Sequence, residues 1–122
     1  MRRLAIVVSF GVLAGCVTPS IPIPPPDPAK MTFHVEGTGS ASTATFSYAH
    51  DDQYVDAVVY VFNRDVGQGV IQSANPDGSI GPTQPFPAKI GDRVEVSVQR
   101  VDQTESTCVR VKDGAPDAFD PC

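Results

Sequence analysis

The amino-acid sequence predicts an all-β fold, a small antiparallel β-sandwich that spans residues 31–122. Apolar and polar residues alternate with a period of two in several short stretches, which is the pattern of strands with one buried face. No long stretch shows the 3.6-residue period of an amphipathic helix. The chain also contains 12 prolines and 10 glycines among its 122 residues, and this composition favours short strands joined by many turns.

The strands are predicted from this alternation along the chain. In residues 43–48, Ala44, Phe46 and Tyr48 alternate with Thr and Ser, so one face of this strand is expected to be buried. The stretch 54–62 (YVDAVVYVF) is largely apolar on both faces and is the predicted central strand. Further strands are expected at residues 32–36, 68–73, 79–81, 93–99 and 108–112.

Two short sequences between these strands have the chemistry of tight turns. Residues 75–78 (NPDG) have Asn first, Pro second and Gly fourth, as a type I turn prefers. Residues 89–92 (KIGD) are expected to turn the chain just before the strand at 93–99. Short strands joined by such turns, without helices, are typical of an antiparallel sandwich.

The second half of the chain resembles bacterial Ig-like domains. The stretch ANPDGSIGPTQPFPAKIGDRVEVSVQRVD contains a DG turn followed by the pattern A-x-x-GD-x-V-x-V-x-V, which recurs in those domains. The resemblance covers roughly residues 55–111 and implies an Ig-like β-sandwich. The sequence departs from the pattern in the proline-rich residues 82–87, which replace a plain strand. It also contains no tryptophan, which excludes the antibody type of core.

The chain begins with the charge and hydropathy pattern of an export signal. Residues 1–3 (MRR) are cationic, and residues 4–14 form an apolar stretch that is too short to span a bilayer. A buried core helix is the alternative for such a stretch, but the flanking arginines and the lack of a polar face favour a signal peptide at residues 1–15.

The end of this stretch, Leu13-Ala14-Gly15-Cys16, resembles the lipobox of bacterial lipoproteins. By this resemblance Leu13, Ala14 and Gly15 are recognised by the signal peptidase, and Cys16 becomes the lipidated N-terminus that carries acyl chains such as palmitate. Two or more such chains anchor a protein stably in a membrane. In Gram-negative lipoproteins an Asp after the cysteine retains the protein in the inner membrane. Because Val17 occupies that position here, the resemblance implies the outer membrane if the organism has one, with the domain in the periplasm or at the surface.

Residues 16–30 are predicted to be a tether between the lipidated cysteine and the domain. Six prolines between residues 19 and 28 favour an extended polyproline II conformation, so the segment is expected to act as a semi-rigid spacer of about 40 Å. Residues 19–22 also match a PxxP ligand of SH3 domains formally. Such domains are not expected outside the cytoplasm, which favours the tether.

The lipobox resemblance assigns Cys16 to lipid and leaves Cys108 and Cys122 as a pair in an oxidising compartment, where they are expected to form a disulfide. By parity, Cys108 points away from the face that carries Val109 and Val111. The C-terminal tail is therefore predicted to fold back over the outer side of the last strand. This differs from the buried inter-sheet disulfide of antibody domains.

Candidate catalytic and metal-binding residues are few, and no nucleophile with a base or phosphate-binding loop is evident, so the protein is not expected to be an enzyme. His34, His50, Asp51 and Asp52 are weak candidates for a metal site, since His and carboxylate groups bind zinc. Their spacing fits no metal motif, and a solvated loop explains them as well. No cofactor is expected.

A second weak set of metal ligands lies in the acidic C-terminal tail. Asp113, Asp117 and Asp120 offer the oxygen donors that calcium prefers, but their spacing fits no EF-hand loop. A solvated acidic tail is the plainer interpretation.

Two groups of residues are candidates for a partner surface. The first is aromatic: Tyr48, Tyr54, Tyr60 and Phe62. Packing in the core and on the sheet faces is the alternative interpretation for these four. The second is the loop 82–87, where prolines such as Pro85 and Pro87 rigidify the chain and Phe86 is a possible hydrophobic anchor. The alternative for this loop is a cover over a strand edge.

The charge balance excludes one class of partner. The whole chain has a formal net charge of −5, and removal of Arg2 and Arg3 with the signal peptide leaves seven basic and fourteen acidic side chains, a net charge of −7. Such a surface repels phosphate backbones, so no nucleic-acid partner is expected.

These observations lead to one expected function and two alternatives. The expectation is an envelope lipoprotein that contacts the membrane through its lipid anchor and binds an unknown protein or glycan partner, its Ig-like domain serving as a binding or structural module. One alternative is an accessory or inhibitor subunit of an envelope enzyme or assembly machine. The other is a metal-binding protein or hydrolase that uses the two histidines.

Overall fold

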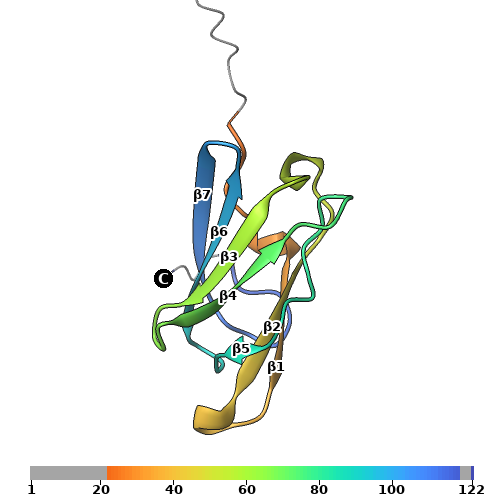
Figure 1. Cartoon of the computed structure of the whole chain (residues 1–122). Coiled ribbons are helices and arrows are strands. Elements are labelled where there is room, and N and C mark those ends of the chain that lie inside the picture. Colours follow the sequence, from red (N-terminus) through yellow and green to blue (C-terminus); the bar gives the residue numbers. More distant parts are fainter. Residues whose placement is uncertain (1–21, 119–121) are drawn as a thin grey trace, which may run out of the picture.

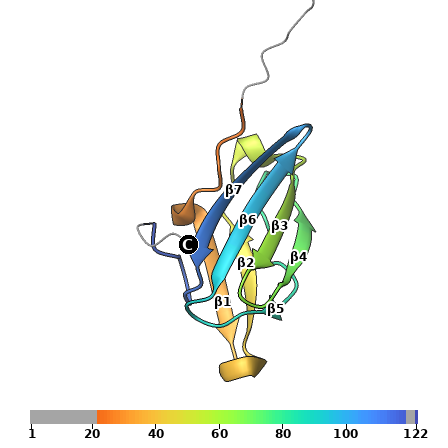
Figure 2. The same cartoon turned by 90° about the vertical axis from the view of Figure 1, so that its left-hand side faces the viewer.

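Two antiparallel sheets pack face to face in the computed structural model, which describes residues 22–118 and 122 (Figures 1 and 2). Within this part of the chain one sheet has the strand order β1-β2-β5 and the other the order β4-β3-β6-β7. The predicted all-β sandwich is confirmed. The strands are β1 (Met31–Glu36), β2 (Thr43–Tyr48), β3 (Val58–Asn63), β4 (Gln68–Ser73), β5 (Phe86–Pro87), β6 (Arg93–Arg100) and β7 (Gln103–Arg110), and the 3-10 turns are η1 (Pro28–Lys30), η2 (Gly39–Ala41) and η3 (Asp52–Tyr54).

The core lies between the two sheets and follows from the period-two alternation. In β6, Val94, Val96 and Val98 are fully buried, while the residues between them face outward. On the opposite sheet, Phe33 and Phe46 are also fully buried, and their ring centroids lie 5.3 Å apart. Burial of each such side chain stabilises the fold by about 1.5–3 kcal/mol.

Strand β3 pairs with both β4 and β6, which confirms the predicted central strand. It begins at Val58 and not at Tyr54. The reason is local: Asp56 has a φ of +63°, which is incompatible with an extended strand. Tyr54 instead belongs to η3, and its side chain enters the core from this turn.

Strand β5 and most of β7 lie outside the strands predicted from the sequence. The strand expected at 79–81 is only a single bridge between Ile80 and Tyr48, and the pairing with β2 is continued by the two-residue strand β5. Strand β7 starts at Gln103, five residues before the expected position. Its first inward-facing residues are polar, so they carry no hydrophobic alternation.

The two predicted turns are confirmed. The amide of Gly78 donates to the carbonyl of Asn75 (2.9 Å), and the amide of Asp92 donates to the carbonyl of Lys89 (3.1 Å). Gly91 has a φ of +92°, a conformation that favours glycine at the third position of a turn.

The second of these turns leads into a buried polar cluster at the end of the central strand. The side chains of Asn63 and Asp92 are both buried, and Asn63 Nδ2 donates to Asp92 Oδ2 (2.9 Å) and to the carbonyl of Pro87 (3.0 Å). The amide of Lys89 donates to the same Asp92 oxygen (3.0 Å), and Lys89 Nζ lies 3.3 Å from the other. Burial opposes ionisation of Asp92, but these hydrogen bonds and the lysine charge together outweigh it, so the pKa of Asp92 is lowered.

This cluster predicts a specific dependence of stability on pH. The lowered pKa means that ionised Asp92 stabilises the folded state fully above the pKa of an unfolded Asp, about 4, and that this contribution is lost as the pH falls through the folded pKa. We expect Asp92→Asn to lower the free energy of unfolding by about 1–3 kcal/mol at pH 7. The amide oxygen of asparagine can still accept from Asn63 and Lys89, but the loss of the negative charge weakens both hydrogen bonds and removes the ion pair with Lys89 Nζ. The difference from wild type should shrink below pH 4. Urea denaturation at a series of pH values measures both effects, and Asp102→Asn in the exposed β6–β7 turn is the control.

The C-terminal tail continues the first sheet before it returns to the second. The amide of Phe33 donates to the carbonyl of Gly114 (2.9 Å), and the amide of Gly114 donates to the carbonyl of Phe33 (2.8 Å). The amide of Val35 donates to Asp113 Oδ1 (3.2 Å). The tail therefore covers the outer edge of β1, a contact that the sequence did not predict.

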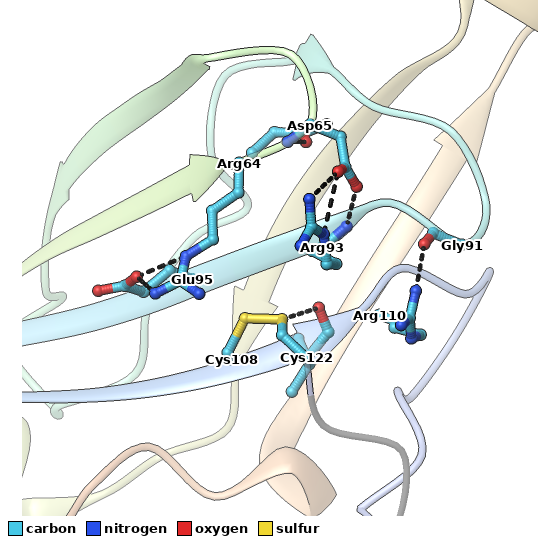
Figure 3. Close-up of a disulfide and its surroundings, with 10 residues drawn as sticks. Arg64, Asp65, Gly91, Arg93, Glu95, Cys108, Arg110 and Cys122 are labelled. Carbon is cyan, nitrogen blue, oxygen red and sulfur yellow. Dashed lines mark hydrogen bonds and ion pairs between the residues drawn. A yellow bond between two sulfur atoms is a disulfide. The ribbon is translucent and has the colours of Figure 1, made fainter.

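Cys122 then meets Cys108 on the outer face of β7 (Figure 3). The two cysteines are paired at disulfide distance, with their Cα atoms 5.4 Å apart. Val109 beside them is buried in the core, whereas Cys108 is only half-buried, so the predicted parity is confirmed. The pair pins the end of the tail outside the sandwich and does not link the two sheets. Residues 119–121 of the tail lie outside the described part of the chain.

The pairing predicts the thiol content of the protein. Full-length protein denatured without reductant should expose no titratable thiol at Cys108 or Cys122, as mass spectrometry after alkylation would show. Cys122→Ser should lower the free energy of unfolding by about 3 kcal/mol, because it opens a loop of roughly fifteen residues in the unfolded chain. Alkylation of both cysteines in the unreduced wild-type protein would contradict the prediction.

Candidate interaction surfaces

Residues 22–27 (PIPPPD), here called the proline strap, run alongside β7 and lead through η1 into β1 (Figure 2). The side chains of Ile23 and Pro26 are buried against the sandwich. The strap was assigned to the tether by its composition, and in the structure it packs on the domain. Residues 1–21, with the predicted signal peptide and the lipobox from Leu13 to Cys16, lie outside the described residues.

The strap has only two backbone N–H groups, because its other residues are prolines. Both are hydrogen-bonded to side chains of the sandwich. The amide of Ile23 donates to Gln103 Oε1 (2.7 Å), and the amide of Asp27 donates to Tyr48 Oη (2.9 Å). Every donor of this segment is thus satisfied by the domain, as a buried backbone requires.

Two carbonyl groups of the strap are held in the same way. Tyr54 Oη donates to the carbonyl of Pro24 (2.7 Å), and Thr107 Oγ1 donates to the carbonyl of Pro26 (2.5 Å). Prolines keep their carbonyl acceptors, so hydroxyl groups are suitable partners for them. This explains why the inward face of β7 is polar at Gln103 and Thr107: the strap and not the hydrophobic core lies opposite.

Tyr48 and Tyr54 pack against each other beneath the proline strap. Their ring centroids lie 5.3 Å apart, and both side chains are buried. Burial raises the pKa of Tyr48 and of Tyr54 above that of a free tyrosine, so both phenols stay protonated. Two of the four residues that the sequence offered as an exposed aromatic surface are therefore in the core, where they bind the strap.

The weak metal candidates do not converge. Strand pairing places His34 opposite Thr45, and His50 lies beyond the end of β2 at Tyr48, so at least three residues of strand, about 10 Å, separate the two histidines. His50 Nε2 lies 2.8 Å from Asp52, whereas Asp51 pairs with Lys30 (3.1 Å).

The exposed side chain of His34 lies instead near Glu36 (3.2 Å) and Asp113 (3.7 Å). Of the acidic tail, Asp117 lies 3.5 Å from Lys112, and Asp120 is outside the described residues. Within residues 22–118 and 122, no three His, Cys, Asp or Glu side chains are grouped so as to hold a metal ion.

Phe86 is not an exposed anchor, which corrects the expectation for the loop 82–87. Its side chain is only 1% exposed, because β5 pairs with β2 and directs Phe86 between the sheets. Pro85 is exposed and Pro87 is half-buried. The alternation of burial in β5 was hidden in the sequence by the surrounding prolines.

The outer face of β3 and β4 carries exposed apolar side chains. Phe62 is 45% and Ile71 is 68% exposed, and Tyr60 lies directly opposite Ile71 in the strand pairing. A shallow hollow of about 370 Å³ lies among these residues and Gly69. Two of the four aromatic candidates, Tyr60 and Phe62, therefore belong to an apolar surface.

A different surface lies at the end of the sandwich that is farther from Pro22, where the loops 37–42, 64–67 and 88–92 come together (Figure 1). Two adjoining hollows of about 220 and 270 Å³ share Gly39, Ser42 and Lys89 in their walls. We call this surface the distal end.

Apolar and charged groups lie side by side at the distal end. Val66 lines one hollow and Ile90 the other, and the two side chains are 43% and 64% exposed. Lys89 lies between them and pairs with the buried Asp92. Exposed apolar residues around a fixed charge form the kind of small surface that a protein or glycan partner contacts.

Three arginines form a row beside the cysteine pair (Figure 3). Arg93 pairs with Asp65 (2.7 Å), and Arg64 pairs with Glu95. Arg110 donates to the carbonyl of Gly91 (3.4 Å). Because each guanidinium is bound by an acceptor of the protein itself, we assign the row a structural role in joining the loops to β6 and β7.

Comparisons with protein-family models, with curated proteins and with solved structures gave no significant match. In the described part of the chain no helix has the length and apolar character needed to cross a membrane.

The strap contacts predict the effect of removing one hydroxyl. Tyr54→Phe deletes the hydrogen bond to Pro24 but keeps the ring, so we expect the free energy of unfolding to fall by about 1 kcal/mol. Amide hydrogen exchange should become faster at Ile23, whose N–H is protected only while the strap is docked. Tyr60→Phe removes an exposed hydroxyl that contacts Gln99, and serves as the control. Equal exchange in both variants would show that Tyr54 does not hold the strap.

Proposed function

We propose that this protein is a bacterial lipoprotein anchored in the cell envelope through Cys16, whose sandwich is a binding or structural module for a protein or glycan partner. The lipobox-like sequence Leu13-Ala14-Gly15-Cys16 and the preceding apolar stretch support the anchor. The observation that carries the proposal is the docked strap. Because residues 22–27 are bound to the domain, only the residues between Cys16 and Pro22 remain as a spacer to the membrane.

The maximum length of this spacer follows from its number of residues. From Cys16 to Pro22 the chain covers six residues, which span at most about 20 Å when fully extended. A lipid-bearing cysteine would therefore hold the Pro22 end of the sandwich close to the membrane surface. This end carries the β6–β7 turn and the loop that contains Gln53, which lies with Pro22 around one small hollow.

The partner contact would lie at the distal end. Strand β6 spans eight residues from the distal end to the anchored end, or about 27 Å. The distal end would thus face away from the membrane, into the periplasm if the anchor lies in the inner leaflet of an outer membrane. Val66, Lys89 and Ile90 are the residues that a partner would contact there.

The anchor is tested by Cys16→Ser in the full-length chain expressed in a bacterial host. We expect the variant to leave the membrane fraction or to remain unprocessed, and to lose incorporation of a labelled palmitate analogue, because the thiol that carries the lipid is absent. Cys122→Ser, which removes a cysteine of the domain, is the matched control and should remain in the membrane fraction. Unchanged membrane association and labelling of Cys16→Ser would refute the proposal.

A further inference from the structure

The four edge strands of the sandwich are protected to different degrees. The edge of β1 is hydrogen-bonded to Gly114 of the tail, and β5 is only two residues long. Strand β7 is polar and is bordered by the strap and by the cysteine-pinned tail. Strand β4 has six residues and ends its sheet, and no backbone hydrogen bond joins its outer edge to another segment of residues 22–118. Open edges of this kind are templates for pairing with another strand.

The backbone groups on this edge can be assigned from the register. The amide of Ala74 donates to the carbonyl of Ala57 (2.9 Å), so the pairs 57–74, 59–72, 61–70 and 63–68 are the hydrogen-bonded ones. Alternation then directs the N–H and C=O groups of Gly69, Ile71 and Ser73 to the open edge. These three residues are symmetric about Ile71.

This symmetry matches a two-fold axis. If a second copy of β4 pairs in antiparallel orientation around Ile71, each Ile71 lies opposite its counterpart, and Gly69 lies opposite Ser73 of the other copy. All of these are positions whose backbone groups face the edge, so the two strands satisfy each other. The flanking residues are small, and Ile71 is 68% exposed and faces the same side as Tyr60.

The absence of charged residues around β4 also favours a second copy of this chain as the partner. Residues 66–76 contain no Asp, Glu, Lys, Arg or His, although 19% of the whole chain is charged. An interface on a two-fold axis brings each residue close to its own copy, so any charge there would face a like charge. In a protein with a net charge of −5, an uncharged edge is what a second copy requires, whereas an unrelated partner is free to use opposite charges.

We propose that two copies of this protein associate through their β4 strands, which joins the two four-stranded sheets into one continuous sheet around Ile71. The apolar surfaces made of Tyr60, Phe62 and Ile71 then meet across the axis, and each Ile71 approaches the hollow beside Gly69 of the other copy. The proposal does not depend on the lipid anchor.

The experiment uses the full-length protein, exported in a bacterial host and extracted in a mild non-ionic detergent. Light scattering coupled to gel filtration should give a protein mass of twice the monomer that falls to one monomer on dilution. Ile71→Lys places two like charges across the axis and should give the monomer mass at every concentration. Ile90→Lys is the matched control, since Ile90 is 64% exposed at the distal end, and it should keep the doubled mass.

A second measurement locates the contact without relying on mass. Ile71→Cys should form a disulfide-linked dimer in envelopes on a non-reducing gel, whereas Ile90→Cys should not. A wild-type protein that is monomeric throughout would overturn the proposal, as would a doubled mass for Ile71→Lys or equal crosslinking of the two cysteine variants. Co-purification of the wild type as a monomer with a different protein on β4 would also overturn it.

Discussion

The structure depends on a constraint set by proline: the strap must close one side of the sandwich although it offers only two backbone donors. Side chains of the domain supply the hydrogen-bond partners of the strap. Gln103 and Tyr48 accept from the two amides, and Tyr54 and Thr107 donate to carbonyls. As a result the inward face of β7 is polar except at Val109, and two tyrosines are retained in the core as neutral phenols. The domain therefore begins before β1, at the strap.

Those parts of the fold that rest on local chemistry were predictable. The alternation in β2, β3 and β6 gave the faces of these strands, and the NPDG and KIGD sequences gave two turns that the structure contains. The parity of Cys108 correctly placed the cysteine pair outside the core. In each case a residue and its immediate neighbours decide the outcome, so that no knowledge of distant contacts is needed.

The parts that failed depend on distant partners. The start of β7 has no hydrophobic period because it faces the strap, which lies some eighty residues earlier in the chain. Phe86 was a candidate anchor for a partner because it lies in a loop that prolines rigidify, yet pairing with β2 turns it inward. The surfaces that now bear the functional proposals, the distal end and the β4 edge, arise where loops or strands from separate regions meet. Ile90 and Val66 are ordinary turn residues in the sequence, and only the fold brings them to one end.

The position of the strap has a consequence for the order in which the protein folds. The chain is made from its N-terminus, so the strap is the first part of the domain to be made. Its partners Gln103 and Thr107 lie 80 and 81 residues later and are among the last parts to emerge. Contacts of such long range make folding slow, because a large loop must close before they form. The side of the sandwich beside β7 therefore stays open until most of the chain is available, and the first segment of the domain to be made can dock only after its distant partners have been made.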